Sequence, residues 1–279
     1  SRTPLSLPSC VNDVVENMAA MVDNIDIRTP RGSQSVFNYR VTPYTGGSDH
    51  MMFIDRKVPG VMFSHSDYTH HTSEDTPDKV DPVELERSEM IAASTLWYLA
   101  NLSPDQALDV LDLVRANATR RIGMLAPIAR EYIRSAEKRD LPMAWAEVGN
   151  KFNQAIKCEI DAGKSVLTFC DVNKIKLAAQ ALQLHLGTRF QALFDQVRWQ
   201  VEEIGYSALV PPALEETPDT RVPVRLTRGP LDFRLPESRL LPEEAAWYSS
   251  KEFKLDGDQR FELANFIDGK LTVSEIRNA

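Results

Sequence analysis

Cysteine and long apolar runs are both scarce in this chain of 279 residues. Three cysteines cannot all pair, and Cys158 and Cys170 are expected on one helix, about 18 Å apart by helical rise. We therefore predict that disulfides do not organise the fold, and the cysteines leave the cellular compartment open. No apolar stretch approaches the roughly 20 residues that a membrane-spanning helix needs, so no membrane span is expected.

Basic runs are missing as well. The net charge is −8, and no cluster of Lys and Arg offsets it, which argues against nucleic acid or an anionic membrane as a partner. With 43% apolar and 26% charged residues, the composition is that of an ordinary globular protein. The length is sufficient for one large domain or two ordinary ones.

Residues 1–102 are predicted to form an incomplete α/β unit, with a partial sheet and flanking helices. Apolar residues at helical spacing predict helices over 9–24 and about 51–57. Alternation over 36–41 and an apolar run over 58–63 predict two strands. Two strands are too few for an independently stable sheet, so the rest of the sheet is expected from elsewhere.

Residues 103–205 are predicted to form an antiparallel bundle of three long helices. Ser103 followed by proline opens the first helix, by the same device as Asp81 further upstream: a capping residue and then proline. Pro127 should kink this helix by removing one backbone bond. The second helix is expected over about 143–169 and the third from about 172, and their apolar stripes are interpreted as mutual burial.

Residues 206–279 are predicted to form a proline-rich extended strap and a small helical tail. The strap, about 206–242, holds seven prolines and shows little periodicity. Beyond it, two helical patterns flank Asp268-Gly269, which is typical of a turn, and Thr272 or its neighbour should cap the second helix. This helix-turn-helix lacks a basic recognition face, so packing against the body is preferred to DNA binding.

Four of the five histidines lie within 22 positions, from His50 to His71, among acids, hydroxyls and glycines. This mixture is typical of a metal site or a polar catalytic pocket rather than a core. An imidazole ligand needs an oxygen partner for its second nitrogen, and one could come from His71-Thr72-Ser73-Glu74-Asp75-Thr76 itself. The alternative is a surface histidine, and the spacing of the four histidines matches no recognised zinc pattern.

The Ser48-Asp49-His50 segment follows two glycines and precedes a predicted helix. Glycine lets the backbone turn tightly and approach a ligand, and a helix N-terminus offers free N–H groups to an anion. The alternative is that Ser48 or Asp49 merely caps the helix. The two roles are compatible.

Three runs in this order resemble the C-terminal part of the zinc-dependent aminopeptidase family, a group of co-catalytic di-zinc exopeptidases. They are Thr45-Gly46-Gly47-Ser48-Asp49-His50-Met51-Met52-Phe53, then Val58-Pro59-Gly60-Val61, then His71-Thr72-Ser73-Glu74-Asp75-Thr76-Pro77-Asp78-Lys79-Val80-Asp81-Pro82. The combination is specific, and it covers about residues 40–100. The bundle and tail are similar to the C-terminal extension of a bacterial subgroup.

The resemblance implies an incomplete zinc-exopeptidase-type sheet and makes His71 a zinc ligand, the last of five in chain order. His70 stands where the family carries an aromatic residue beside that ligand, and Asp75 would orient the loop. In Ser48-Asp49-His50, the serine would be a hydrogen-bonding partner near the ligand, and the other two residues would lie at the rim of the site. Two zinc ions and a peptide substrate are expected in the intact enzyme.

The other zinc ligands and the general base are missing from this sequence. Residues 1–45 contain no histidine and no Glu-Glu pair, so no catalytic residue is identified. We therefore predict the C-terminal portion of a secreted or periplasmic zinc aminopeptidase, inactive by itself, whose remaining half is another segment or a second chain. A cytoplasmic location stays open. In the intact enzyme a metal-activated water would release N-terminal residues from peptides. The alternatives are a non-catalytic scaffold with a degenerate peptidase remnant and a glutaminyl-cyclase-like transferase.

Overall fold

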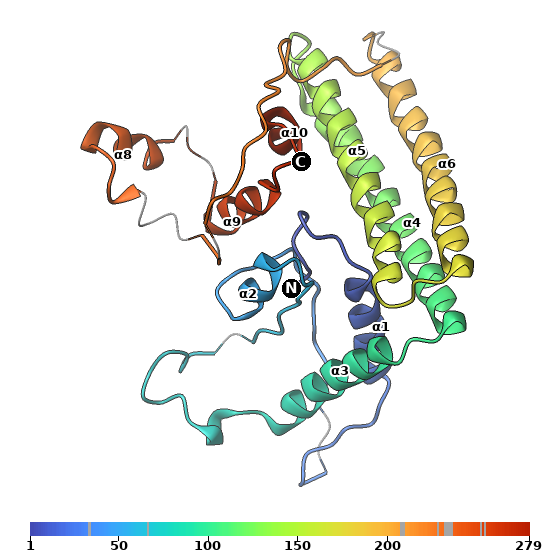
Figure 1. The fold of residues 1–279 in the computed structure, drawn as a ribbon, viewed down its shortest axis with the longest axis vertical. Helices are drawn as coiled ribbons and strands as arrows, with labels where there is room; N and C mark the ends of the chain where they lie inside the picture. The colour runs from blue at the N-terminus through green and yellow to red at the C-terminus, as the bar shows by residue number, and fades with distance from the viewer. Residues whose placement is uncertain are drawn as a thin grey trace.

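The computed structural model describes residues 1–32, 35–65, 67–206, 210–227, 229–231, 237–251, 253 and 255–279. All the regular secondary structure in these residues is helical (Figure 1). The helices are α1 (Val11–Asp23), α2 (His50–Asp55), α3 (Pro82–Ala100), α4 (Pro104–Ser135), α5 (Leu141–Lys164), α6 (Asn173–Glu203), α8 (Pro242–Tyr248), α9 (Gly257–Phe266) and α10 (Val273–Asn278), with short 3-10 helices at Pro77–Lys79 and Ser165–Thr168.

The prediction of an α/β sheet is wrong, because the described part of the chain contains no strand. Residues 36–41 and 58–63 do not pair with each other. Instead Met62 and Thr42, which follows the first of these segments, bond to the first two residues. Arg2 N–H donates to Thr42 O (3.1 Å), Met62 N–H donates to Ser1 O (3.3 Å), and the Ser1 ammonium group donates to Met62 O. A strand needs a ladder of such bonds along a neighbour, and these isolated contacts do not make one. The period-2 pattern alone cannot supply that neighbour.

The helix starts follow their capping residues as predicted. The Asp81 carboxylate accepts the N–H groups of Val83 (2.8 Å) and Glu84 (3.3 Å) at the start of α3. Ser103 forms a capping box with Gln106 at the start of α4, and Thr272 forms one at the start of α10. The helix expected over 143–169 ends earlier, at Lys164, and continues as the 3-10 helix. Helix α4 continues through Pro127 without interruption.

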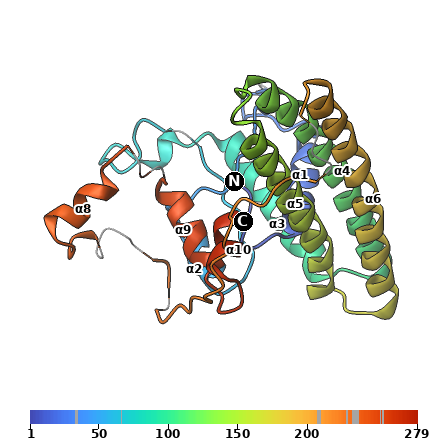
Figure 2. The same cartoon turned by 90° about the horizontal axis from the view of Figure 1, so that it is seen from above.

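Helices α4, α5 and α6 lie side by side and antiparallel, as both views show (Figures 1 and 2). At one end of this bundle Trp145 and Phe152, both fully buried, pack against the rings of Phe190 and Phe194. The ring centroids of Trp145 and Phe194 are 4.9 Å apart. The apolar stripes of these helices are therefore buried against one another, as the sequence predicted.

Helix α1 docks onto the other end of the bundle. Val14 of α1 shares a buried cluster with Val114 of α4 and Leu182 of α6. Helix α3 packs on α1, where a second cluster contains Val22 and Ile91. Helix α1 and the C-terminal end of α3, through Leu99, therefore share one hydrophobic cluster with α4 and α6.

A buried ion cluster crosses the same junction. Arg121 on α4 donates from Nη1 to Asp13 on α1 (2.8 Å) and from Nε and Nη2 to Glu159 on α5 (2.6 Å each). The Asp13 side chain is 0% exposed, and the Arg121 side chain is 14% exposed. Burial raises the pKa of Asp13, although Arg121 opposes the shift. One guanidinium thus pairs two carboxylates from two other helices.

The tail returns to the N-terminal part of the chain. Its strap crosses α5 at Gly149, where an added Cβ would lie 2.6 Å from a side-chain carbon of Pro211. Asn150 then donates to the backbone oxygen of Asn278 at the end of α10 (2.7 Å). Part of the predicted strap lies outside the described residues. No described helix has the length and apolarity needed to cross a membrane, and all three cysteines are free thiols.

Replacing Arg121 with Met should lower the free energy of unfolding by about 3–5 kcal/mol, because two buried carboxylates would lose their counter-charge. Asp13→Asn should cost less, on the order of 1 kcal/mol, because Glu159 still pairs Arg121 through two bonds. Urea unfolding followed by circular dichroism measures both. Equal losses for the two variants would contradict the central role given to Arg121.

Candidate functional site

The Ser48-Asp49-His50 segment forms the entry to α2. Asp49 occupies the N-cap position, but its side chain makes no capping bond, and Ser48 and Asp49 are both exposed. Gly47 has a φ of +95°, a conformation that favours glycine. The His50 ring is half-buried, with Nε2 2.9 Å from Thr45 O, while Nδ1 is buried without a partner among the described atoms.

The His70-His71 pair lies on an exposed turn between α2 and α3. The two rings stack with their centroids 3.8 Å apart. His71 has a φ of +61°, in the left-handed region that non-glycine residues rarely adopt. The structure therefore places the predicted ligand on a defined turn, with its ring accessible to solvent.

This turn is held by hydrogen bonds that the sequence patterns did not indicate. Asp67 accepts from both N–H (2.7 Å) and Oγ1 (2.6 Å) of Thr69, which holds the pKa of Asp67 below its usual range. Thr72 Oγ1 donates to Thr69 O (2.6 Å) and accepts from Glu74 N–H (3.2 Å). The Asp75 side chain, expected to orient the loop, is exposed, and its backbone N–H donates to Thr72 O (3.3 Å). The Asp-x-Thr spacing was the signal available for Asp67.

No complete metal-ligand set is present in the described residues, where no three His, Cys, Asp or Glu side chains come together to hold an ion. Among the described residues, no hydrogen bond or ring contact joins the segment at His50 to the turn at His71. The donors of the described residues alone do not fit a zinc ion, because protein zinc sites use three or four protein ligands. A zinc site at His71 requires donors from outside the described residues.

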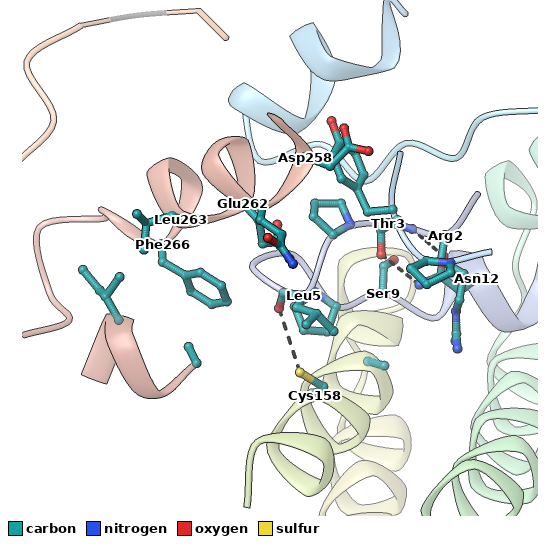
Figure 3. A pocket seen from close by; sticks show the side chains of 18 of the residues that line it. Arg2, Thr3, Leu5, Ser9, Asn12, Cys158, Asp258, Glu262, Leu263 and Phe266 are labelled. Carbon is teal, nitrogen blue, oxygen red and sulfur yellow. Dashed lines mark hydrogen bonds between the residues drawn. The ribbon is translucent and has the colours of Figure 1, made fainter. Parts of the chain in front are cut away.

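A cavity of about 600 Å³ lies elsewhere, between the N-terminal segment, α5 and the tail helices (Figure 3). Leu5, Tyr44 and Phe266 line it among other apolar groups. Burial, together with the nearby carboxylates of Asp258 and Glu262 on α9, raises the pKa of Tyr44. Burial also raises the pKa of the Cys158 thiol to about 11, so this thiol is protonated at neutral pH and is a poor nucleophile. Nothing in this cavity forms a catalytic pair.

Comparison with known families gives one match, to the first part of the chain. The segment that carries the Ser-Asp-His and His-Thr-x-x-Asp-Thr motifs is similar to a metallopeptidase family. Residues 8–96, about a third of the chain, match the family model described as Peptidase family M28, which confirms the resemblance drawn from the motifs. The match begins just before α1 and ends inside α3, ahead of the bundle. No curated protein and no solved structure matches the chain.

The pH dependence of stability should carry the signature of Glu262. Its carboxylate accepts from Ser6 N–H (3.0 Å) and Oγ (2.8 Å), yet burial is the larger effect and raises its pKa above 4.5. The folded state then keeps a proton that the unfolded chain has lost, so this contribution is complete below pH 4.5 and is lost as the pH rises through the folded-state pKa.

In urea unfolding between about pH 4 and pH 7, the wild type should therefore lose stability relative to Glu262→Gln as the pH rises. Glu243→Gln, which changes an exposed acid of α8, is the matched control and should run parallel to the wild type. A wild-type curve that gains on Glu262→Gln with rising pH would give the opposite sign and contradict this assignment.

Proposed function

We propose that this chain is the C-terminal portion of a zinc-dependent aminopeptidase, with the remaining ligands and the general base supplied by another segment or a second chain. The family match supports a metallopeptidase-type function. The aminopeptidase direction, the two zinc ions and a secreted or periplasmic location are the finer parts of the proposal. His71 is the zinc ligand that this chain would contribute.

Exposed apolar side chains in and next to the segment that matches the family model, residues 8–96, support the proposal that another segment or chain completes the domain. Val36 is 87% exposed and Phe53 is 57% exposed, and clustered apolar side chains at a surface are typical of an interface with another chain or segment. The large apolar side chains exposed between residues 36 and 97 are Val36, Tyr39, Val41, Met52, Phe53, Val58, Phe63, Tyr68, Val80, Leu85, Leu96 and Trp97. Much of this surface lies in the segment between α1 and α3. A partner that covers it would also bring its own groups toward the His71 turn.

The turn itself supports His71 as the contributed ligand. A left-handed backbone at a non-glycine residue costs on the order of 1–3 kcal/mol and persists where the surroundings hold it, often at functional sites. Here the bonds among Asp67, Thr69 and Thr72 hold it. His70, stacked on His71, and the Ser48-Asp49-His50 segment remain the proposed lining of the completed pocket, with Asp75 on the same turn.

Zinc content of a completed assembly tests this function. The chain is co-expressed with the sequence encoded immediately upstream in its reading frame, and zinc is measured in the purified complex by mass spectrometry. We expect about two zinc ions per complex and hydrolysis of aminoacyl-p-nitroanilides. His71→Ala should lower the zinc content and reduce the hydrolysis rate by at least about 100-fold.

The control is His185→Ala, which changes the one histidine of the bundle helix α6. It should leave zinc content and hydrolysis unchanged. Absence of zinc from the complex, or full zinc content in His71→Ala, would contradict the proposal. The first result favours a non-catalytic scaffold built on the bundle, and cyclisation of peptides with N-terminal glutamine would favour a glutaminyl-cyclase-like transferase instead.

A further inference from the structure

The tail helix α9 reaches back to the segment that precedes α2. Gly46 N–H donates to Asp258 Oδ1 at 2.8 Å, across 212 positions of sequence. Hydrogen bonds to a charged acceptor are stronger than those between neutral groups. This bond ties the first turn of the tail helix to the two glycines that lead into Ser48-Asp49-His50.

Glycine at position 46 is what permits this approach. A Cβ added to Gly46 would lie 2.9 Å from Asp258 Oδ1, closer than real Cβ contacts allow, and 3.3 Å from Met51 Sδ. Since the Asp258 carboxylate is the movable group, Gly46→Ala would push it away and break the bond. The absence of a side chain at position 46 therefore lets the Asp258 carboxylate reach the Gly46 amide.

An aromatic contact runs beside this bond. The Phe261 ring, on a residue only 3% exposed, stacks on Tyr44 with a centroid distance of 5.4 Å and an interplanar angle of 15°. Tyr44 in turn lies 5.7 Å from the His50 ring. Movement of α9 would thus be transmitted to His50 through the Tyr44 ring, in addition to the backbone at Gly46.

The far end of α2 is tied to the tail region too. Lys57 Nζ donates to Asn265 O at the end of α9 (2.9 Å). Asp55 pairs with Arg225 of the strap (2.8 Å) and accepts from Gly229 N–H (2.9 Å). Because these bonds and the Glu262–Ser6 contact do not involve Asp258, the tail keeps its place when the Asp258 carboxylate alone is removed.

We propose that Asp258 is a positioning residue: it fixes the Gly46–His50 segment at the rim of the site, acting through the Gly46 amide. The consequence for catalysis rests on the proposed peptidase function, but the positioning itself does not. The chain therefore carries in its tail a part of the site architecture that lies outside the family match, which ends at residue 96.

The positioning is tested on this chain by NMR with 15N-labelled glycine, since 12 glycines give a simple spectrum. In Asp258→Ala the Gly46 amide should exchange with solvent at least about tenfold faster, and the His50 ring signals should shift. Gly46→Ala should shift the His50 signals in the same way. Asp258→Asn, which keeps an acceptor oxygen, should restore most of the protection. Glu243→Ala, an exposed acid of α8, is the control.

Unchanged Gly46 exchange and His50 signals in Asp258→Ala would overturn the proposal. In the completed peptidase, Asp258→Ala should lower kcat about tenfold with zinc content and KM unchanged, and Asp258→Asn should recover most of it. Full kcat in Asp258→Ala would overturn the catalytic consequence. A wild-type complex without zinc or activity would contradict the proposed function, whereas the amide measurement would still decide whether Asp258 fixes the segment.

Discussion

The buried pairing of Arg121 with Asp13 and Glu159 is the constraint on which the rest of the structure depends. A buried charge without a partner is strongly destabilising, so Asp13 and Glu159 both depend on Arg121. The cluster fixes α1 against α4 and α5 at a defined rotation and height, which general apolar contact would not do. Helix α3 then packs on α1, and the hydrophobic cluster around Val14 and Val114 continues across the junction.

Within residues 8–96, which match the family model, some elements pack against the bundle and others are exposed. Helices α1 and α3 belong to the common core, whereas the chain between α2 and α3 contains only one 3-10 helix and is largely exposed. The tail closes over the N-terminal residues and both ends of α2, through Ser6, Gly46 and Lys57. What stays open is the His71 turn and the apolar surface around Phe53 and Phe63. That distribution is what a site completed by further chain would require.

Most helices, and the capped starts of three of them, could be predicted from the sequence because their signals are local. Asp81, Ser103 and Thr272 bond to N–H groups two or three residues away, so a few consecutive residues are enough to predict these caps. The strands over 36–41 and 58–63 were wrong because strand pairing depends on a neighbour that a local pattern does not contain. The α/β expectation relied on that period-2 signal, and the structure supplies no ladder for it among the described residues.

The motifs of the candidate site could be predicted from the sequence, but the long-range hydrogen bonds and ion pairs that hold its segments could not. The order of Ser-Asp-His and His-Thr-x-x-Asp-Thr led to the family that the comparison confirmed. The Asp258–Gly46 bond joins residues 212 positions apart. The partner of Asp13, Arg121, lies on another helix, so no local pattern distinguishes Asp13 from other acids of an amphipathic helix. Asp67 could have been found, because an Asp two residues before a Thr is a known turn signal.

Hydrogen exchange of the whole chain, followed by mass spectrometry, tests the account most directly. It shows whether α1 is packed against the bundle while the His71 turn stays exposed in the same molecule. Peptides from α1 should exchange as slowly as those from α4, because they share one core and one ion cluster. Peptides from residues 67–81 should exchange much faster than those from α1 and α4, because this exposed turn is held only by local hydrogen bonds. Fast exchange in α1, or strong protection across 67–81 in the isolated chain, would contradict the account.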